Sequence, residues 1–435
     1  MPFNGNVVIS DWNKNSPQSL NTLASRFAAQ ISAIVEISET VIPELEKKGL
    51  KYIEEVKDRT SRHLNREEKR AYKGGIEAFM AEFKNLTTPG KTSIKIDMPP
   101  AAALALAHYV QTAARYAYVG SREEVTRRAL LVSLISNFEI LFGKLARVVY
   151  EKNKAALNDS EYSFTLQQLS EFDSVEDARE FLIERRLSVL LRDSVDGWEK
   201  WLGRACGGLS MTAFPVDWPG IRESFARRNL IVHAESKVNQ IYLDTVKDLK
   251  LPRETLPSKG ESLKVSSEYL LESAERIMAL GVILTAEITR KLHKKEGSAA
   301  VAMLAEEAEE CARRGFWKAS IAISGHALDC PSDRSQRIDI QTSNWLARKE
   351  IFGKSSIQEE VEAWDISGLS PQLSHRKRLL LDPESAVSEI EELLEQGELA
   401  AYELASNPLY EGVLGIIADR KESELESSTL NEITS

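Results

Sequence analysis

The stretch SREEVTRRALLVSLISNFEILFGKLARVVYEKN, residues 121–153, decides the fold class of this chain. Its apolar side chains recur every three or four residues without a proline, and Ser121 and Glu124 form the Ser-x-x-Glu pattern that begins many helices. Elsewhere Gly and Pro are sparse, at 22 and 14 of 435 residues, while Ala, Leu, Glu, Lys and Arg dominate long runs. The sequence therefore predicts an all-α protein.

The length of the chain, 435 residues, predicts two or three domains. We expect an N-terminal helical segment over residues 1–118, which includes a long amphipathic helix over residues 16–49. An antiparallel helical bundle is predicted over residues 119–295. Further helical hairpins are predicted over residues 296–420, and the polar tail, residues 421–435, is predicted to be disordered.

The stretch GFWKASIAISGHALDCP, residues 315–331, resembles the second half of a tetratricopeptide repeat. It has a glycine and an aromatic residue, then an aliphatic helical run, and a closing proline. Two weaker helical patterns follow at roughly the 35-residue period of such repeats. The resemblance implies a degenerate array of TPR-like hairpins, which offers a surface to a protein partner.

Charge is distributed unevenly along the chain, whose net charge is -10. Residues 296–435 contain 27 acidic and 13 basic side chains, a net charge of -14, whereas residues 1–295 contain 39 acidic and 43 basic ones, a net charge of +4. An anionic ligand such as RNA is therefore expected on the first two thirds of the chain, and the acidic last third is not expected to contact phosphates.

Several classes of site and location are disfavoured by the sequence. The three cysteines form no CxxC pair, which favours a reducing compartment and predicts no metal site. The stretch PGKTS, residues 89–93, lacks the first glycine of a P-loop, because Asn85 stands at that position, so no nucleotide cofactor is expected. Neither the N-terminus nor the alanine-rich run at residues 99–120 has the pattern of a membrane segment. We expect a cytoplasmic protein without cofactor or membrane contact.

The candidate functional stretch is FARRNLIVHAES, residues 225–236. On residues alone, it reads as a surface helix with arginines that reach water and a structural histidine. Arg228 and His233 nevertheless form an Arg-x4-His pattern, and this pattern with its flanks, residues 226–243, resembles the motif region of the HEPN superfamily (higher eukaryotes and prokaryotes nucleotide-binding domains). The resemblance covers residues 121–295 and includes Ser136 and Glu139, where such domains often place a polar pair.

The resemblance implies a metal-independent endoribonuclease, and the chemistry of the residues is suited to that role. Attack by the RNA's own 2'-hydroxyl needs a base, an acid for the 5'-oxygen and a cation near the phosphate, and it gives 2',3'-cyclic phosphate ends. A histidine serves either proton-transfer role, and an arginine binds phosphate oxygens. Arg228 and His233 are therefore the predicted catalytic residues. By the resemblance, the protein is a bacterial toxin or an antiviral defence effector.

Helix geometry adds an expectation about oligomeric state. Residues five apart lie about 140° apart around an α-helix, so Arg228 and His233 do not converge on one regular helix. Either the helix frays near Val232, or two chains pool their motifs across a twofold axis in a homodimer, as the resemblance implies. In this scheme Asn229 orients His233 and Arg227 adds diffuse attraction. Glu139 holds an arginine in place, with Ser136 beside it.

The alternative is a catalytically inert HEPN/TPR-like interaction or scaffold protein. The negative charge of Glu235 stands two residues after His233, where it repels RNA. If the arginine and histidine are buried and paired within one chain, they are structural. The sequence leaves both hypotheses open.

Overall fold

The computed structural model describes residues 17–85, 97–118, 122–157, 164–249 and 257–417. The described residues form helices, with one isolated antiparallel bridge between Lys237 and Ser262, so the predicted all-α class is confirmed. Three sequence predictions lie outside the described residues: the P-loop-like stretch 89–93, the helix start at Ser121 and the disordered tail, residues 421–435.

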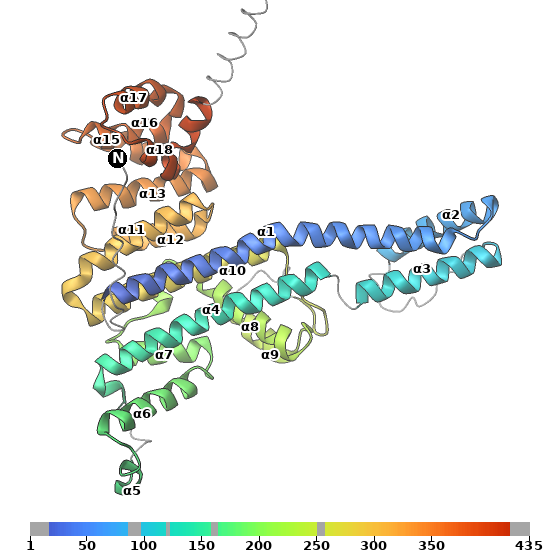
Figure 1. Cartoon of the computed structure of the whole chain (residues 1–435), viewed down its shortest axis with the longest axis horizontal. Coiled ribbons are helices and arrows are strands. Elements are labelled where there is room, and N and C mark those ends of the chain that lie inside the picture. Colours follow the sequence, from blue (N-terminus) through green and yellow to red (C-terminus); the bar gives the residue numbers. More distant parts are fainter. Residues whose placement is uncertain (1–16, 86–96, 119–121, 158–163, 250–256, 418–435) are drawn as a thin grey trace, which may run out of the picture.

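The body of the molecule is an antiparallel bundle of four long helices (Figure 1). These are α1 (Pro17–Ser61), α4 (Arg122–Lys152), α8 (Trp218–His233) and α10 (Ser267–Leu292). α1 runs antiparallel to α4, because Phe27 meets Phe138 while the later Glu46 pairs with the earlier Arg127. α8 runs antiparallel to α10 in the same way. Further helices flank them: α5 (Leu166–Leu169), α6 (Val175–Leu190), which is as long as α8, α7 (Val195–Ala205) and α9 (Gln240–Lys247).

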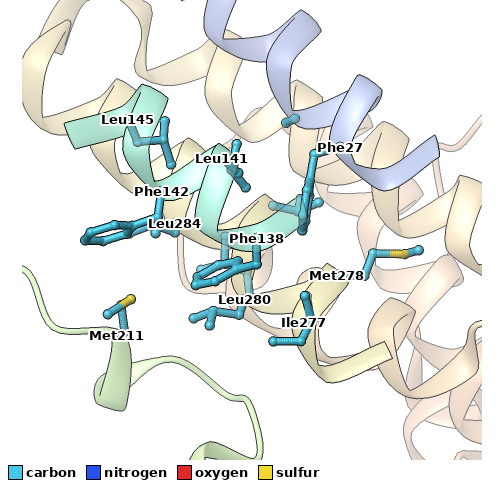
Figure 2. Close-up of a cluster of buried hydrophobic side chains, with 14 of the residues drawn as sticks. Phe27, Phe138, Leu141, Phe142, Leu145, Met211, Ile277, Met278, Leu280 and Leu284 are labelled. Carbon is cyan, nitrogen blue, oxygen red and sulfur yellow. The ribbon is translucent and has the colours of Figure 1, made fainter. Parts of the chain in front are cut away.

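The central core forms where α1, α4 and α10 meet (Figure 2). Phe138 and Phe142 of α4 are buried against Trp198 of α7, and the Phe142 and Trp198 rings stack with centroids 4.5 Å apart. In the described part of the chain, α4 is the one helix long and apolar enough to cross a membrane by length and composition. Since α4 packs against α1, α8 and α10, its apolar residues have a role in this core.

The second half of α1 leaves the bundle and forms an arm with α2 (Arg66–Asn85) and α3 (Pro100–Tyr118) (Figure 1). The arm has its own small core, in which the Tyr72 and Tyr109 rings meet edge to face at 6.4 Å. The turn between α1 and α2 lies at the far end of the arm, away from the bundle (Figure 1).

The C-terminal third begins with three packed helices, α11 (Gly297–Arg313), α12 (Trp317–Leu328) and α13 (Arg334–Phe352). The predicted helical run at residues 315–331 is thus α12. Shorter helices follow: α14 (Gln358–Ala363), α15 (Pro371–Ser374), α16 (Arg376–Leu381), α17 (Pro383–Glu395) and α18 (Ala401–Ser406). All of these except α15 contribute to a separate apolar cluster with the end of α13.

The apolar clusters do not follow the predicted boundaries at residues 118 and 295. Leu20, Phe27 and Ile31 of α1 lie in the same cluster as the bundle, and so do Leu304 of α11 and Ile323 of α12. Long helices pack through continuous apolar stripes, and sequence periodicity does not indicate which helices face one another. The core of the bundle therefore includes residues from both flanking segments.

Candidate functional site

Helix α8, which contains the Arg-x4-His pattern, is fixed at both ends. Asp217 caps its first turn by accepting a hydrogen bond from Gly220 N at 3.1 Å. In its middle, Phe225 packs edge to face on Phe138 and Trp198, with centroids 6.2 and 5.8 Å away. These contacts orient α8 so that Arg228 lies beside α4.

Arg228 forms an ion pair with Glu139 of α4. Its Nη2 donates to both carboxylate oxygens, at 2.8 and 2.7 Å, and its Nη1 donates to Asn229 Oδ1 at 3.1 Å. Burial raises the pKa of Glu139 above its ordinary value, while the adjacent guanidinium opposes that shift. The prediction that Glu139 holds an arginine in place therefore agrees with this contact, and Arg228 is that arginine.

Part of the Arg228 guanidinium remains without a partner. Its Nε is buried and makes no hydrogen bond within the described part of the chain. Glu139 binds Nη2 alone, and one hydrogen bond to Asn229 leaves a second N–H of Nη1 unassigned. The ion pair thus orients the arginine without occupying all of its donors.

His233 lies at the end of α8 and is exposed. Among the described residues none hydrogen-bonds its ring. The helix continues through Val232 to His233, so the helix does not fray there, and that alternative from the sequence is wrong. Arg228 and His233 consequently stay about 140° apart around the helix axis. One chain alone does not bring the two side chains together through its helix.

The turn after His233 is held in a conformation that is rare for residues with a side chain. Glu235 and Ser236 have φ angles of 50° and 63°, in the left-handed region. Ser236 N donates to Leu230 O at 2.9 Å, and Ser236 O accepts from Leu263 N at 2.9 Å. These bonds stabilise the strained turn. They therefore fix the position at which α8 ends and the position of the His233 backbone.

Arg227 has a structural role that the sequence prediction missed. Its Nε donates to Glu223 Oε1 at 2.8 Å, its Nη1 donates to Lys264 O at 2.9 Å, and its guanidinium lies 3.9 Å from the Tyr269 ring centroid. Burial alone would lower the pKa of Arg227, but Tyr269 and Glu223 more than offset it and raise that pKa. These contacts give Arg227 a packing role within one chain, and its diffuse attraction for RNA stays a prediction.

The buried carboxylate of Glu223 is the centre of this cluster. It also accepts hydrogen bonds from the Tyr242 hydroxyl, at 2.6 Å, and from the Tyr269 hydroxyl. Burial raises the pKa of both tyrosines, so they remain donors. The four-residue spacing of Glu223 and Arg227 was the one sequence signal of this pairing.

The two remaining predicted residues do not act as expected. Asn229 accepts from Arg228 instead of orienting His233, because its side chain turns toward the preceding arginine. Ser136 lies half-buried on α4, one turn before Glu139, and within the described residues no hydrogen bond to its side chain is found.

A second polar cluster lies outside α8. Glu287, His326 and Cys330 bring three potential metal ligands within 4.8 Å of one another. Arg290 already occupies this cluster, since its Nη1 contacts Glu287 and lies 3.2 Å from Cys330 Sγ. His326 Nε2 lies 3.1 Å from Glu287 Oε1, and burial raises the pKa of Cys330. A guanidinium in this place fits a structural ion-pair network better than a cation site.

No family model matches this chain, no curated protein matches its sequence, and no solved structure matches its fold.

Proposed function

We propose that the protein is a metal-independent HEPN-type endoribonuclease that works as a homodimer. In each of two composite sites, Arg228 of one chain acts with His233 of the other. The observation that carries the proposal is the difference between the two side chains on one helix. Arg228 is oriented by Glu139, whereas His233 is exposed at the helix end with no bond to any described residue.

The proposed reaction needs only groups of the RNA and of these two side chains. One His233 takes the proton of the 2'-hydroxyl, the 2'-oxygen bonds to phosphorus, and the bond from phosphorus to the 5'-oxygen breaks. The same His233, now protonated, gives that proton to the leaving oxygen. The free Nη1 donor of Arg228 stabilises the charge on the phosphate oxygens. The products are a 2',3'-cyclic phosphate and a 5'-hydroxyl.

Two exposed apolar side chains beside the motif support the dimer. Ile140 follows Glu139 on α4 and is 57% exposed, and Val232 precedes His233 on α8 and is 50% exposed. Both lie next to a residue of the proposed site, where a second chain has to approach if the site is composite. A twofold contact through these residues would cover apolar surface while joining the two motifs.

A catalytically inert interaction module is the second candidate, and one observation favours it. Arg228 and Glu139 neutralise each other within one chain, and the Glu235 side chain, 88% exposed, adds negative charge near His233. Both features weaken the attraction for RNA. In this case the TPR-like C-terminal helices would bind a protein partner, and α8 would serve packing alone.

The test is cleavage of total cellular RNA in EDTA by the wild type, Arg228→Ala and His233→Ala, with 2',3'-cyclic phosphate ends as the readout. His108→Ala is the matched control, because His108 is an exposed histidine on the distant arm. We expect the wild type and the control to cut and both motif variants to lose at least about a hundredfold in rate, the scale of a lost general acid or base. Equal cleavage by all four proteins, or by none, would favour the inert module.

By the resemblance, such an enzyme acts in the cytoplasm as a toxin or an antiviral defence effector. The proposal requires no cofactor. The TPR-like helices provide the surface for a protein that controls the activity.

A further inference from the structure

The far end of the arm carries a concentrated positive charge. Residues 59–73, which span the turn from α1 to α2, contain six basic and two acidic side chains, a net charge of +4. The six basic side chains are all exposed: Arg59, Arg62, Arg66, Lys69, Arg70 and Lys73. We call this region the arm tip. Residues 1–295 as a whole also have a net charge of +4, so the arm tip accounts for the entire positive excess of the first two thirds of the chain.

The charges of the arm tip are not used in ion pairs. No carboxylate among the described residues lies within ion-pair distance of these six side chains, whereas Arg127, Arg147 and Arg228 in the bundle all have acidic partners. Of the two acids in the arm tip, Glu68 is committed to the start of α2, where it accepts from Asn65 N at 2.9 Å. The positive charge is therefore available to an external anion.

The arm tip is rigid enough to present these charges in a fixed arrangement. Tyr72 is buried, and its hydroxyl lies 2.6 Å from Thr60 Oγ1, which ties α2 to α1. On the outer face of α2, the basic residues recur at three- and four-residue spacing, so they form one stripe along the helix: Arg66, Lys69, Arg70 and Lys73. A linear row of cations on a fixed helix fits the repeated phosphates of a nucleic-acid backbone.

We propose that the arm tip binds the phosphate backbone of a structured RNA and holds that RNA across the α8 site. This inference rests on the proposed function for the identity of the ligand. Arginine offers a planar fork that matches phosphate oxygens, and four of the six cations are arginines. A membrane fits less well, because no large apolar side chain between residues 59 and 73 is exposed.

The position of the arm tip indicates the size of the RNA. Val35 is the last α1 residue in the central core, and Arg59 lies 24 residues further along the same helix. At about 1.5 Å per residue, Arg59 stands roughly 36 Å from Val35 along the helix axis. α8 and α9 lie on the side of the bundle from which the arm leaves (Figure 1). A folded RNA can reach both places, and a trinucleotide cannot.

The test measures binding of fluorescently labelled bulk transfer RNA by the full chain as salt is raised. The variant combines Arg62→Glu, Arg66→Glu and Arg70→Glu, and both it and its reference protein carry His233→Ala to prevent cleavage. The control combines Lys200→Glu, Lys294→Glu and Lys354→Glu. These three lysines are exposed and dispersed, and they change the net charge by the same amount. Far-ultraviolet circular dichroism checks that each protein keeps its helices.

We expect the arm-tip variant to bind transfer RNA at least about tenfold more weakly at low salt, with a plot of log K against log salt that is shallower by about 2 to 3, since three phosphate contacts are lost. The control should match the reference protein. Equal weakening in variant and control would overturn the proposal, because net charge alone would then explain it. Loss of binding to phosphatidylserine vesicles without any loss of RNA binding would also overturn it.

A cleavage assay separates this inference from the proposed function. In a chain with His233 intact, the arm-tip substitutions should slow cleavage of transfer RNA while cleavage of a trinucleotide stays unchanged. If transfer RNA binds through the arm tip but the wild type cuts nothing, the nuclease proposal fails and the arm-tip inference stands. If the wild type cuts transfer RNA and the arm-tip variant cuts it as fast, the arm-tip inference fails and the nuclease proposal stands.

Discussion

At the scale of single residues, the adjacent Arg227 and Arg228 have different roles, because they make different contacts. Arg227 is enclosed by Glu223, Tyr269 and a backbone carbonyl, whereas Arg228 keeps donors that no described residue uses. The sequence predicted that Glu139 holds an arginine, without saying which, and the structure shows that this arginine is Arg228. The sequence did not predict the Arg227 cluster, because Tyr269 lies 42 residues further along the chain and only folding brings it near.

The ion pair between Arg228 and Glu139 should contribute to stability, because it is only partly exposed. We expect Glu139→Ala to lower the free energy of unfolding by about 1–3 kcal/mol, the range for leaving a buried polar group unpaired. Urea denaturation measures this. Glu235→Ala is the control. The Glu235 side chain is 88% exposed, and its ion pair with Lys237 is long, with 3.8 Å between Lys237 Nζ and Glu235 Oε2. A surface change of this kind should stay within about 0.5 kcal/mol. Equal effects of the two substitutions would contradict our interpretation of the pair.

At the scale of elements, the bundle depends on one close approach that periodicity did not reveal. Gly281 lies inside α10, and a β-carbon there would overlap Phe27 Cε1 of α1 and lie 2.8 Å from Leu141 Cδ2 of α4. The sequence predicted these helices from their apolar spacing. It did not predict which of them touch, because each long helix has an apolar stripe that several partners could cover.

Gly281→Ala should therefore destabilise the protein although alanine favours helices. Overpacking of this kind costs typically about 1–3 kcal/mol. Gly325 of α12 is the matched control, since a β-carbon there would meet no atom within 4 Å. Gly325→Ala should be neutral or stabilising by up to about 1 kcal/mol, from helix propensity alone. Thermal or urea unfolding compares the two variants, and a stabilising Gly281→Ala would show that α1 does not pack on α10 in this way.

The contact between α1 and α11 predicts a pH dependence. Glu307 of α11 is buried and hydrogen-bonds the Ser25 hydroxyl of α1 at 2.5 Å. Burial raises the pKa of Glu307 above its ordinary value, and the nearby carboxylates of Glu306 and Glu310 add to the shift. A raised pKa means that the folded state holds this proton more tightly than the unfolded state. The stability that Glu307 contributes is therefore present at low pH and is lost as pH rises through the raised pKa.

Glu307→Gln should remove this dependence, because the amide does not titrate. We expect the melting temperature of the variant to rise relative to that of the wild type as pH increases from mildly acidic to mildly alkaline. Comparing the two proteins at each pH cancels the effect of the overall negative charge. A difference in melting temperature that stays constant across this range would contradict a raised pKa of Glu307 in the folded state.

At the scale of the whole molecule, the central apolar cluster crosses the boundaries that the sequence predicted at residues 118 and 295. Composition located the acidic last third correctly, but the central apolar cluster includes Leu304, Phe316 and Ile323 from that third. Boundaries drawn from loops and charge do not detect shared cores, because the side chains that join them are ordinary aliphatic residues. The arm was likewise predicted as helix, without any signal that it would leave the bundle.

Truncation should reveal this shared core. A chain that ends at residue 295 loses α11 and α12, so we expect it to unfold without cooperativity or to aggregate. A chain that ends at Gly353 keeps α11, α12 and α13 and should retain a cooperative transition, since most of the second apolar cluster lies beyond that point. Circular dichroism melting with light scattering measures both. A stable, cooperative chain of residues 1–295 would contradict the shared core.

The central claim is that Arg228 of one chain acts with His233 of another, and mixing two inactive variants tests it most directly. Arg228→Ala and His233→Ala are prepared separately, denatured together, refolded and assayed on RNA in EDTA. In a mixed dimer one composite site keeps both native residues, and the other has neither. We predict that each variant alone is inactive and that the mixture recovers about a quarter of wild-type activity, because half of randomly paired dimers are mixed and each has one of two sites. An inactive mixture beside an active, refolded wild type would contradict the composite site.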